Sequence, residues 1–179
     1  MKEYVSDLYD KIKGESSGLG NLLAKVPGLG GYMERSRRRE ADQILRDTIS
    51  GHLEASRLTL SSVHQELGRD IIKAMDYAEP LGRADNMLMG LIGKIKDAPQ
   101  GYAGFFDAVK VKEEDLARIY AFDESMLNHV DEVDASIDAL ATAVRDDGDI
   151  NSTIRRLTTV LQAANQDFAG RNEVMMGIS

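Results

Sequence analysis

The sequence of 179 residues contains no cysteine. Disulfide bonds, thiolate zinc sites, iron–sulfur clusters and cysteine nucleophiles are therefore excluded, although this absence alone does not set the cellular compartment. Long hydrophobic runs are also missing, because the longest, MLMGLIG at residues 87–93, is too short to span a bilayer. The N-terminal stretch MKEYVSDLYDKIKG mixes charged and apolar residues and lacks the apolar centre of a secretory signal. We expect a soluble, cytoplasmic protein.

Proline is scarce, and each of Pro27, Pro80 and Pro99 is expected to mark the boundary of an element. The alternation of apolar and polar residues that is typical of strands is absent, whereas apolar residues recur at helical spacing through most of the chain. Hydrophobic residues make up 42% of the sequence and charged residues 29%, both ordinary for a globular protein. The pattern predicts an all-α protein.

Four main amphipathic helices with short connections predict an up-and-down, antiparallel helical bundle. The first is predicted to be very long, because apolar positions keep helical phase over residues 32–78, either straight or bent at Gly51 or Gly68. Pro80 would end this helix and begin the second, over 81–97. The third follows the acidic stretch KEEDL, and the fourth follows RDDGD, where Gly148 and Asp149 are expected to cap the adjoining helices.

The predicted domain organisation places a short amphipathic helix and a glycine-rich arm at residues 1–31, and the helical bundle at 32–179. The predicted helices are unequal, with roughly 47, 17, 34 and 20 residues. The shorter helices would not cover the whole apolar stripe of the longest one. A homodimer that covers the remainder is therefore a hypothesis of the sequence.

Arginines are concentrated at the start of the first predicted helix, in the stretch GYMERSRRREADQIL at residues 31–45. The cluster consists of Arg35, Arg37, Arg38 and Arg39. Glu34, Arg38, Asp42 and Arg46 follow one another at intervals of four, a spacing that favours a solvated helix face laced with ion pairs. Nucleic acid is not expected as a partner, because the whole chain carries a net charge of −8.

A second interpretation of the arginine cluster uses the uneven distribution of charge. Residues 113–149 contain twelve acidic side chains and only two basic ones, a net charge of −10. Such a segment would attract the arginines, either within one chain or across a dimer. The contribution of each exposed pair would be small.

No catalytic motif is present, and no cofactor is expected. His52 and His64 lie twelve residues apart on one predicted helix, on different faces, so they cannot share a metal ion. Glu-x-x-His, His-Glu-x-x-His and Gly-x-Ser-x-Gly are all missing. Asp123 falls in phase with an apolar stripe, which predicts a buried carboxylate with an arginine or histidine partner. The weak candidates for a metal ligand are Asp123, His52 and His129.

Two apolar features are candidate interaction surfaces: Met87 and Met89 in MLMGLIG, and Phe105 and Phe106 in GYAGFF. The sequence therefore predicts a non-enzymatic interaction or scaffold protein that self-associates as a dimer, with a further protein partner as an option. One alternative is a bundle that binds a small ligand or a metal ion in its core. Another is attachment to a membrane surface through residues 1–31, which the mixed charge of that segment disfavours.

Overall fold

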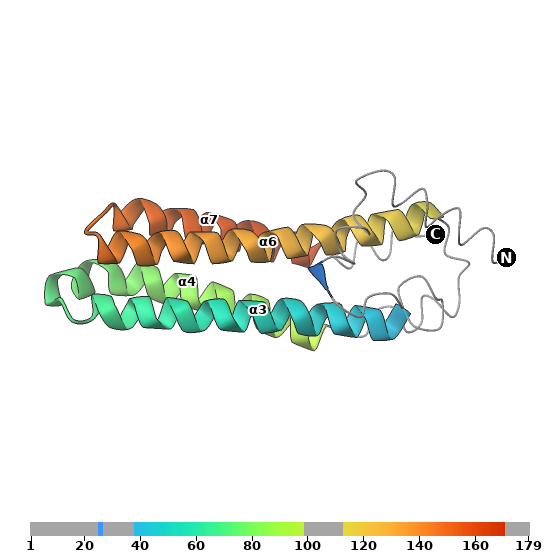
Figure 1. Cartoon of the computed structure of the whole chain (residues 1–179), viewed down its shortest axis with the longest axis horizontal. Coiled ribbons are helices and arrows are strands. Elements are labelled where there is room, and N and C mark those ends of the chain that lie inside the picture. Colours follow the sequence, from blue (N-terminus) through green and yellow to red (C-terminus); the bar gives the residue numbers. More distant parts are fainter. Residues whose placement is uncertain (1–24, 27–37, 99–112, 171–179) are drawn as a thin grey trace. The chain divides into compact units, whose positions relative to one another are not determined.

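The computed structural model describes residues 25–26, 38–98 and 113–170, with the side chains of 38–41 and 113–120 excepted. These ranges contain four helices and no strand, in the order α3 (Arg38–Leu67), α4 (Ile71–Asp97), α6 (Glu113–Arg145) and α7 (Ile150–Ala169) (Figure 1). The prediction of an all-α helical bundle is thus confirmed. The predicted N-terminal helix, the arm and the domain boundary at residue 31 lie outside the described residues, apart from Lys25 and Val26.

The chain divides into two compact units. Unit 1 comprises residues 1–48, 98–125 and 170–179, and unit 2 comprises residues 49–97 and 126–169. Unit 2 contains most of the described residues. It consists of two helical hairpins, one formed by α3 and α4 and the other by α6 and α7.

The first hairpin turns at residues 68–70, so the prediction of one helix over 32–78 is wrong. The backbone N–H of Gly68 donates to the carbonyl of His64, the last bond of the α-helical type, and the two residues that follow donate three positions back instead. The Asp70 carboxylate then accepts hydrogen bonds from the backbone N–H groups of Ile72 and Lys73, at 2.9 and 3.2 Å. Asp70 is therefore the N-cap of α4.

Pro80 does not begin a helix, as the sequence predicted, but lies inside α4. Proline in a helix interior removes one backbone hydrogen bond and costs about 3 kcal/mol. Tertiary packing offsets this cost, because an early turn gives α3 and α4 similar lengths of 30 and 27 residues. The apolar stripes of both helices can then be buried along their length in a bundle. The argument for a homodimer from a 47-residue helix loses its basis.

The second hairpin turns at Asp146–Asp149, as the sequence predicted, but the capping residues differ in part. The Gly148 N–H donates to the carbonyl of Ala143 at 2.8 Å, five residues back. The residue in the left-handed conformation at the end of α6 is Asp147, with a φ of 59°, whereas the sequence predicted Gly148 as the capping residue. Asp149 is the N-cap of α7 as expected, since its carboxylate accepts a 2.9 Å hydrogen bond from the N–H of Ser152.

The core of unit 2 is aliphatic, and it follows the predicted stripes closely. On α3 the buried positions recur at steps of three and four and end at Leu67. α4 and α7 pack against each other directly. Large aliphatic side chains of the first hairpin are almost wholly buried, and they include Leu53, Leu60, Leu67, Leu81, Leu88 and Leu91. Burial of each contributes about 1.5–3 kcal/mol.

Polar contacts define which helices of unit 2 are neighbours. Ser56 of α3 hydrogen-bonds to the Asp134 carboxylate of α6, and Asn165 of α7 donates to the Met87 carbonyl of α4 at 3.2 Å. Both turns lie at the same end of unit 2, where the Lys73 Nζ is 2.5 Å from an Asp147 carboxylate oxygen (Figure 1). Helices are therefore antiparallel within each hairpin, whereas the pairs that these contacts join across the hairpins, α3 with α6 and α4 with α7, run parallel.

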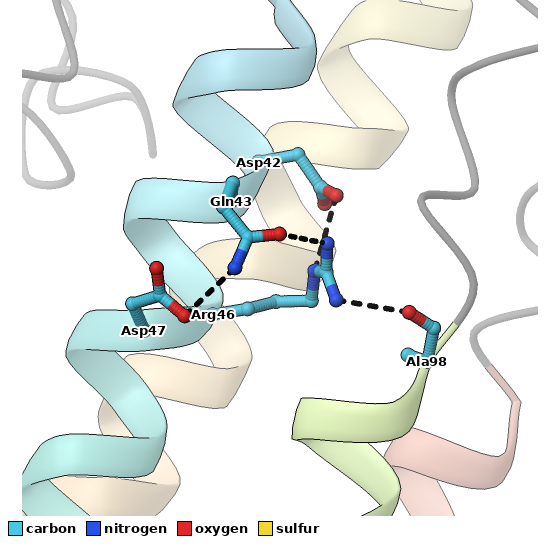
Figure 2. A network of polar contacts seen from close by, with 5 residues as sticks. All are labelled: Asp42, Gln43, Arg46, Asp47 and Ala98. Atoms are coloured by element: carbon cyan, nitrogen blue, oxygen red, sulfur yellow. Dashed lines mark hydrogen bonds and ion pairs between the residues drawn. The ribbon is translucent and has the colours of Figure 1, made fainter.

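In unit 1 the structure describes a buried charged network on the first turns of α3 (Figure 2). The Arg46 guanidinium donates to the Asp42 carboxylate at 3.1 Å, to the Gln43 side-chain oxygen at 2.8 Å and to the Ala98 carbonyl at 2.9 Å. Asp42 is 2% exposed and Arg46 5% exposed. The prediction of a solvated face is therefore wrong at these two positions, because other parts of the same chain pack over them.

Candidate interaction surfaces

Among the side chains that the structure describes, the exposed large apolar ones lie on one of the two hairpins of unit 2. Within the part of the chain that the structure describes, the five exposed ones all belong to α3 or α4, and none belongs to α6 or α7. They are Leu58, Ile71, Ile72, Met75 and Met89. Single exposed apolar residues are ordinary, whereas a concentration of them marks an interaction site. The hairpin of α3 and α4 is thus the candidate for contact with another molecule.

Three of these side chains form a surface at the turn between α3 and α4, which we call the tip surface: Ile71, Ile72 and Met75. Their exposed fractions are 77%, 73% and 81%. Residues three and four apart on a helix are neighbours, so Met75 lies beside both isoleucines. Ile71 was predicted to continue the buried stripe of the first helix. It is exposed because α3 ends at Leu67 and the helical phase is reset.

The surroundings of the tip surface are rich in charge. Lys73 lies among the three apolar residues and pairs with Asp147 of the second turn, with 2.5 Å between the charged atoms. The Asp147 carboxylate, by accepting this hydrogen bond, raises the pKa of the Lys73 ammonium, and Lys73 in turn lowers the pKa of the Asp147 carboxyl. The pair links the two hairpins at their turns.

A shallow groove of about 450 Å³ runs between α3 and α4, beside the exposed Leu58. On its wall the Arg57 guanidinium makes two hydrogen bonds to the Asp85 carboxylate, at 2.7 and 2.9 Å. The hydrogen bond from Arg57 lowers the pKa of the Asp85 carboxyl, against the opposing effect of its partial burial. Glu54, also on the wall, pairs with Lys96 at 2.5 Å. The charged groups of the groove are therefore largely engaged with one another.

Ser61, His64 and Asp85 line this same groove and are the residue types of a hydrolytic triad. A triad needs a hydrogen bond from nucleophile to base and another from base to carboxylate. Among the described residues, no hydrogen bond joins Ser61 to His64 or His64 to Asp85, and Asp85 directs both oxygens to Arg57. The three residues line one groove without the two hydrogen bonds that define a triad.

The predicted apolar segment of α4 is only partly exposed. Met87 is half-buried, and Met89 is 48% exposed. The same segment contains Gly90 and Gly93, whose lack of a side chain allows another element to approach closely. A Cβ added at either position would meet no atom within 4 Å in the described part of the chain. The described residues therefore do not use the space that these glycines leave.

The other predicted interaction residues lie partly outside the described residues. Arg38 and Arg39 begin α3, but their side chains are not described, and Arg35, Arg37, Phe105 and Phe106 lie outside the described ranges. The structure therefore provides no geometry for the arginine cluster or for the two phenylalanines. Both remain predictions of the sequence.

The predicted metal candidates are dispersed between the two units. Asp123 is buried in unit 1, at 4% exposure, as its place in the apolar stripe predicted. His52 is exposed on α3 in unit 2. His129 lies on α6, where its Nε2 is 2.7 Å from the Asp167 carboxylate of α7. No group of three potential metal-binding side chains occurs within residues 25–26, 38–98 and 113–170.

Comparison with known proteins gives no family assignment. No family model, no curated protein and no solved structure matches the chain. Among the described helices, none is both long enough and apolar enough to cross a membrane.

Sequence reasoning missed the tip surface, although the signal was present. Gly68 and Asp70 resemble Gly148 and Asp149, because in each turn a glycine lies between two helices and the aspartate that follows is the N-cap of the second helix. Apolar spacing that continued in phase across Gly68 hid the first turn. A turn at that point places the two isoleucines at the end of a hairpin instead of in a stripe.

Proposed function

We propose that this protein is a non-enzymatic helical-bundle protein that acts through protein–protein interaction and associates with itself. The observation that carries the proposal is that the exposed large apolar side chains among the described residues all lie on the hairpin of α3 and α4. Each such side chain, when buried in a contact, would contribute about 1.5–3 kcal/mol. The second hairpin, which lacks them among its described residues, would face solvent.

Two further features of the same hairpin support this proposal. Its glycines at 51, 82, 90 and 93 have open space where a side chain would project, so another helix could approach the backbone closely. The groove beside Leu58 carries ion pairs that are already formed. At this groove a partner would therefore meet Leu58 beside charges that are already paired, which cost less to cover than unpaired ones.

The test is the mass of the purified full-length protein in solution, measured by sedimentation across a wide concentration series. We expect a reversible equilibrium between monomer and dimer. Leu58→Glu or Met89→Glu, each of which places a charge on an exposed apolar position, should shift the equilibrium toward monomer if that position lies in the contact. Asp138→Lys, on the exposed face of α6, is the matched control and should leave it unchanged. A wild-type protein that stays monomeric at every concentration would contradict self-association.

A further inference from the structure

The three apolar side chains of the tip surface lie at two turns that carry an excess of acidic residues. We call the charged residues of these turns, within 64–76 and 142–153, the acidic rim. Residues 64–76 and 142–153 comprise the two turns and the helical residues next to them. They contain six acidic side chains and three basic ones, a net charge of −3 with histidine neutral. Two of the three basic side chains are already paired, Lys73 with Asp147 and Arg145 with Asp146. The acidic excess of the rim therefore remains for a partner to neutralise.

This combination specifies the chemistry of the partner. Apolar side chains are needed to cover Ile71, Ile72 and Met75, and basic side chains are needed beside them to neutralise the rim. An anionic lipid surface or a nucleic acid would be repelled, because its phosphates carry the same sign of charge as the rim. A basic protein segment with several apolar residues meets both requirements.

The chain itself contains such a segment at residues 29–39, LGGYMERSRRR. It includes three apolar side chains, Leu29, Tyr32 and Met33, and the four arginines of the cluster. With Glu34 its net charge is +3, equal and opposite to that of the rim. The order of residues is also suitable, since the apolar group and the basic group follow one another directly.

Every copy of this chain carries the same segment. The arginine cluster adjoins the first residue of α3, Arg38, whereas the tip surface follows its last residue, Leu67. The 30 residues of one helix therefore separate the two features along the chain. In a reciprocal contact, the tip surface of each copy would bind the arginine-rich segment of the other. Such a reciprocal contact closes as a two-fold dimer.

We infer that the tip surface binds the arginine-rich segment at residues 29–39 of a second copy of this chain, through its apolar centre and acidic rim. This inference rests on the proposed function, because it names the surface and the partner through which self-association occurs. It also gives a role to the arginine cluster, for which the sequence alone is compatible with either a solvated helix face or attraction to acidic residues.

The experiment measures dimerisation of the full-length protein by sedimentation at about 0.1 M and about 1 M salt, between which the Debye length falls from about 10 to about 3 Å. We expect dimerisation to weaken at the higher salt concentration. Arg37→Glu with Arg38→Glu should weaken it at least about tenfold at low salt. Adding Asp76→Lys and Asp146→Lys, which reverse the rim without removing either N-cap, should restore it.

Rescue by the charge swap separates binding from folding, because a variant that merely unfolds would not be restored by changes at the other site. Asp138→Lys in place of the two rim changes is the matched control and should give no rescue. A labelled peptide of residues 27–39 provides a second measurement. It should bind the full-length protein, and the same peptide with each arginine replaced by glutamine should not.

The outcomes distinguish this inference from the proposed function. A dimer that is insensitive to salt, to the arginine changes and to the peptide would overturn the inference while leaving self-association intact. A protein that is monomeric under all conditions would contradict both. Failure of the charge swap to restore a dimer weakened by the arginine changes would also overturn the direct pairing of the two surfaces.

Discussion

Replacing Arg46 with methionine should destabilise the protein far more than a substitution at an exposed arginine. The Arg46 side chain is 6% exposed, and the Asp42 side chain with which it pairs is 3% exposed. Methionine removes the hydrogen bonds to Asp42, to Gln43 and to the Ala98 carbonyl directly after α4 (Figure 2). The buried Asp42 carboxylate would lose its guanidinium partner.

The magnitude follows from which groups remain buried. Loss of one member of a buried ion pair costs about 3–5 kcal/mol, because the charge that remains is poorly compensated. In the double variant Asp42→Leu with Arg46→Met, no buried charge of this pair remains. The hydrogen bonds to the Ala98 carbonyl and the Gln43 side chain are still lost, and an unpaired buried acceptor costs about 1–3 kcal/mol. We therefore expect the double variant to be more stable than Arg46→Met alone.

The assay is urea unfolding followed by circular dichroism, with the wild type, both single variants and the double variant compared as a mutant cycle. The two compact units give reason to follow a second probe, such as tyrosine fluorescence, so that separate transitions would be seen. Arg46→Met that stays within about 0.5 kcal/mol of the wild type would refute the reasoning, since that is the effect of an ordinary surface substitution. Additive single changes would refute the pairing.

Two further predictions concern the α3–α4 hairpin. Asp70→Ala should lower the free energy of unfolding by about 1 kcal/mol, because the two N–H groups at the start of α4 lose their acceptor. Asp70→Asn, which keeps an acceptor, should be nearly neutral; equal losses in the two variants would contradict the N-cap. Arg57 lowers the pKa of the Asp85 carboxyl below the unfolded value near 3.8. Above pH 3.8 the ionised carboxyl therefore stabilises the folded state, and this stabilisation is lost as the pH falls through the lowered pKa. Asp85→Asn should thus lower the free energy of unfolding by up to about 1 kcal/mol at neutral pH, because the carboxyl is partly exposed. The difference in stability from the wild type should shrink below about pH 3.8. A difference that stays constant in urea titrations at several pH values would count against the ion pair.

Helix content was predictable because it depends on local periodicity. The buried positions of α3 from Leu45 to Leu67, and those of α4, α6 and α7, follow from the spacing of apolar residues alone. The α6–α7 turn was also predictable, since Gly148 and Asp149 are residue types that end one helix and begin the next. Asp123 was recognised as buried for the same reason of phase.

The candidate surfaces were less predictable. The tip surface depends on a turn at Gly68, and the sequence offered Pro80 as a competing break. A local rule favours the proline, whereas burial of two helices of similar length along each other favours the glycine. Arg46 and Asp42 have the spacing of an exposed ion pair, and only the chain packed around them makes them buried.

By itself, the sequence determined that the chain is helical, which face of most helices is apolar, and that thiol chemistry is excluded. These properties depend on residue type and short-range spacing. The tertiary structure decided where the first hairpin turns, which helices of the two hairpins are neighbours, and which apolar side chains remain in water. Those outcomes depend on burial summed over contacts between segments far apart in the chain, which no local pattern contains.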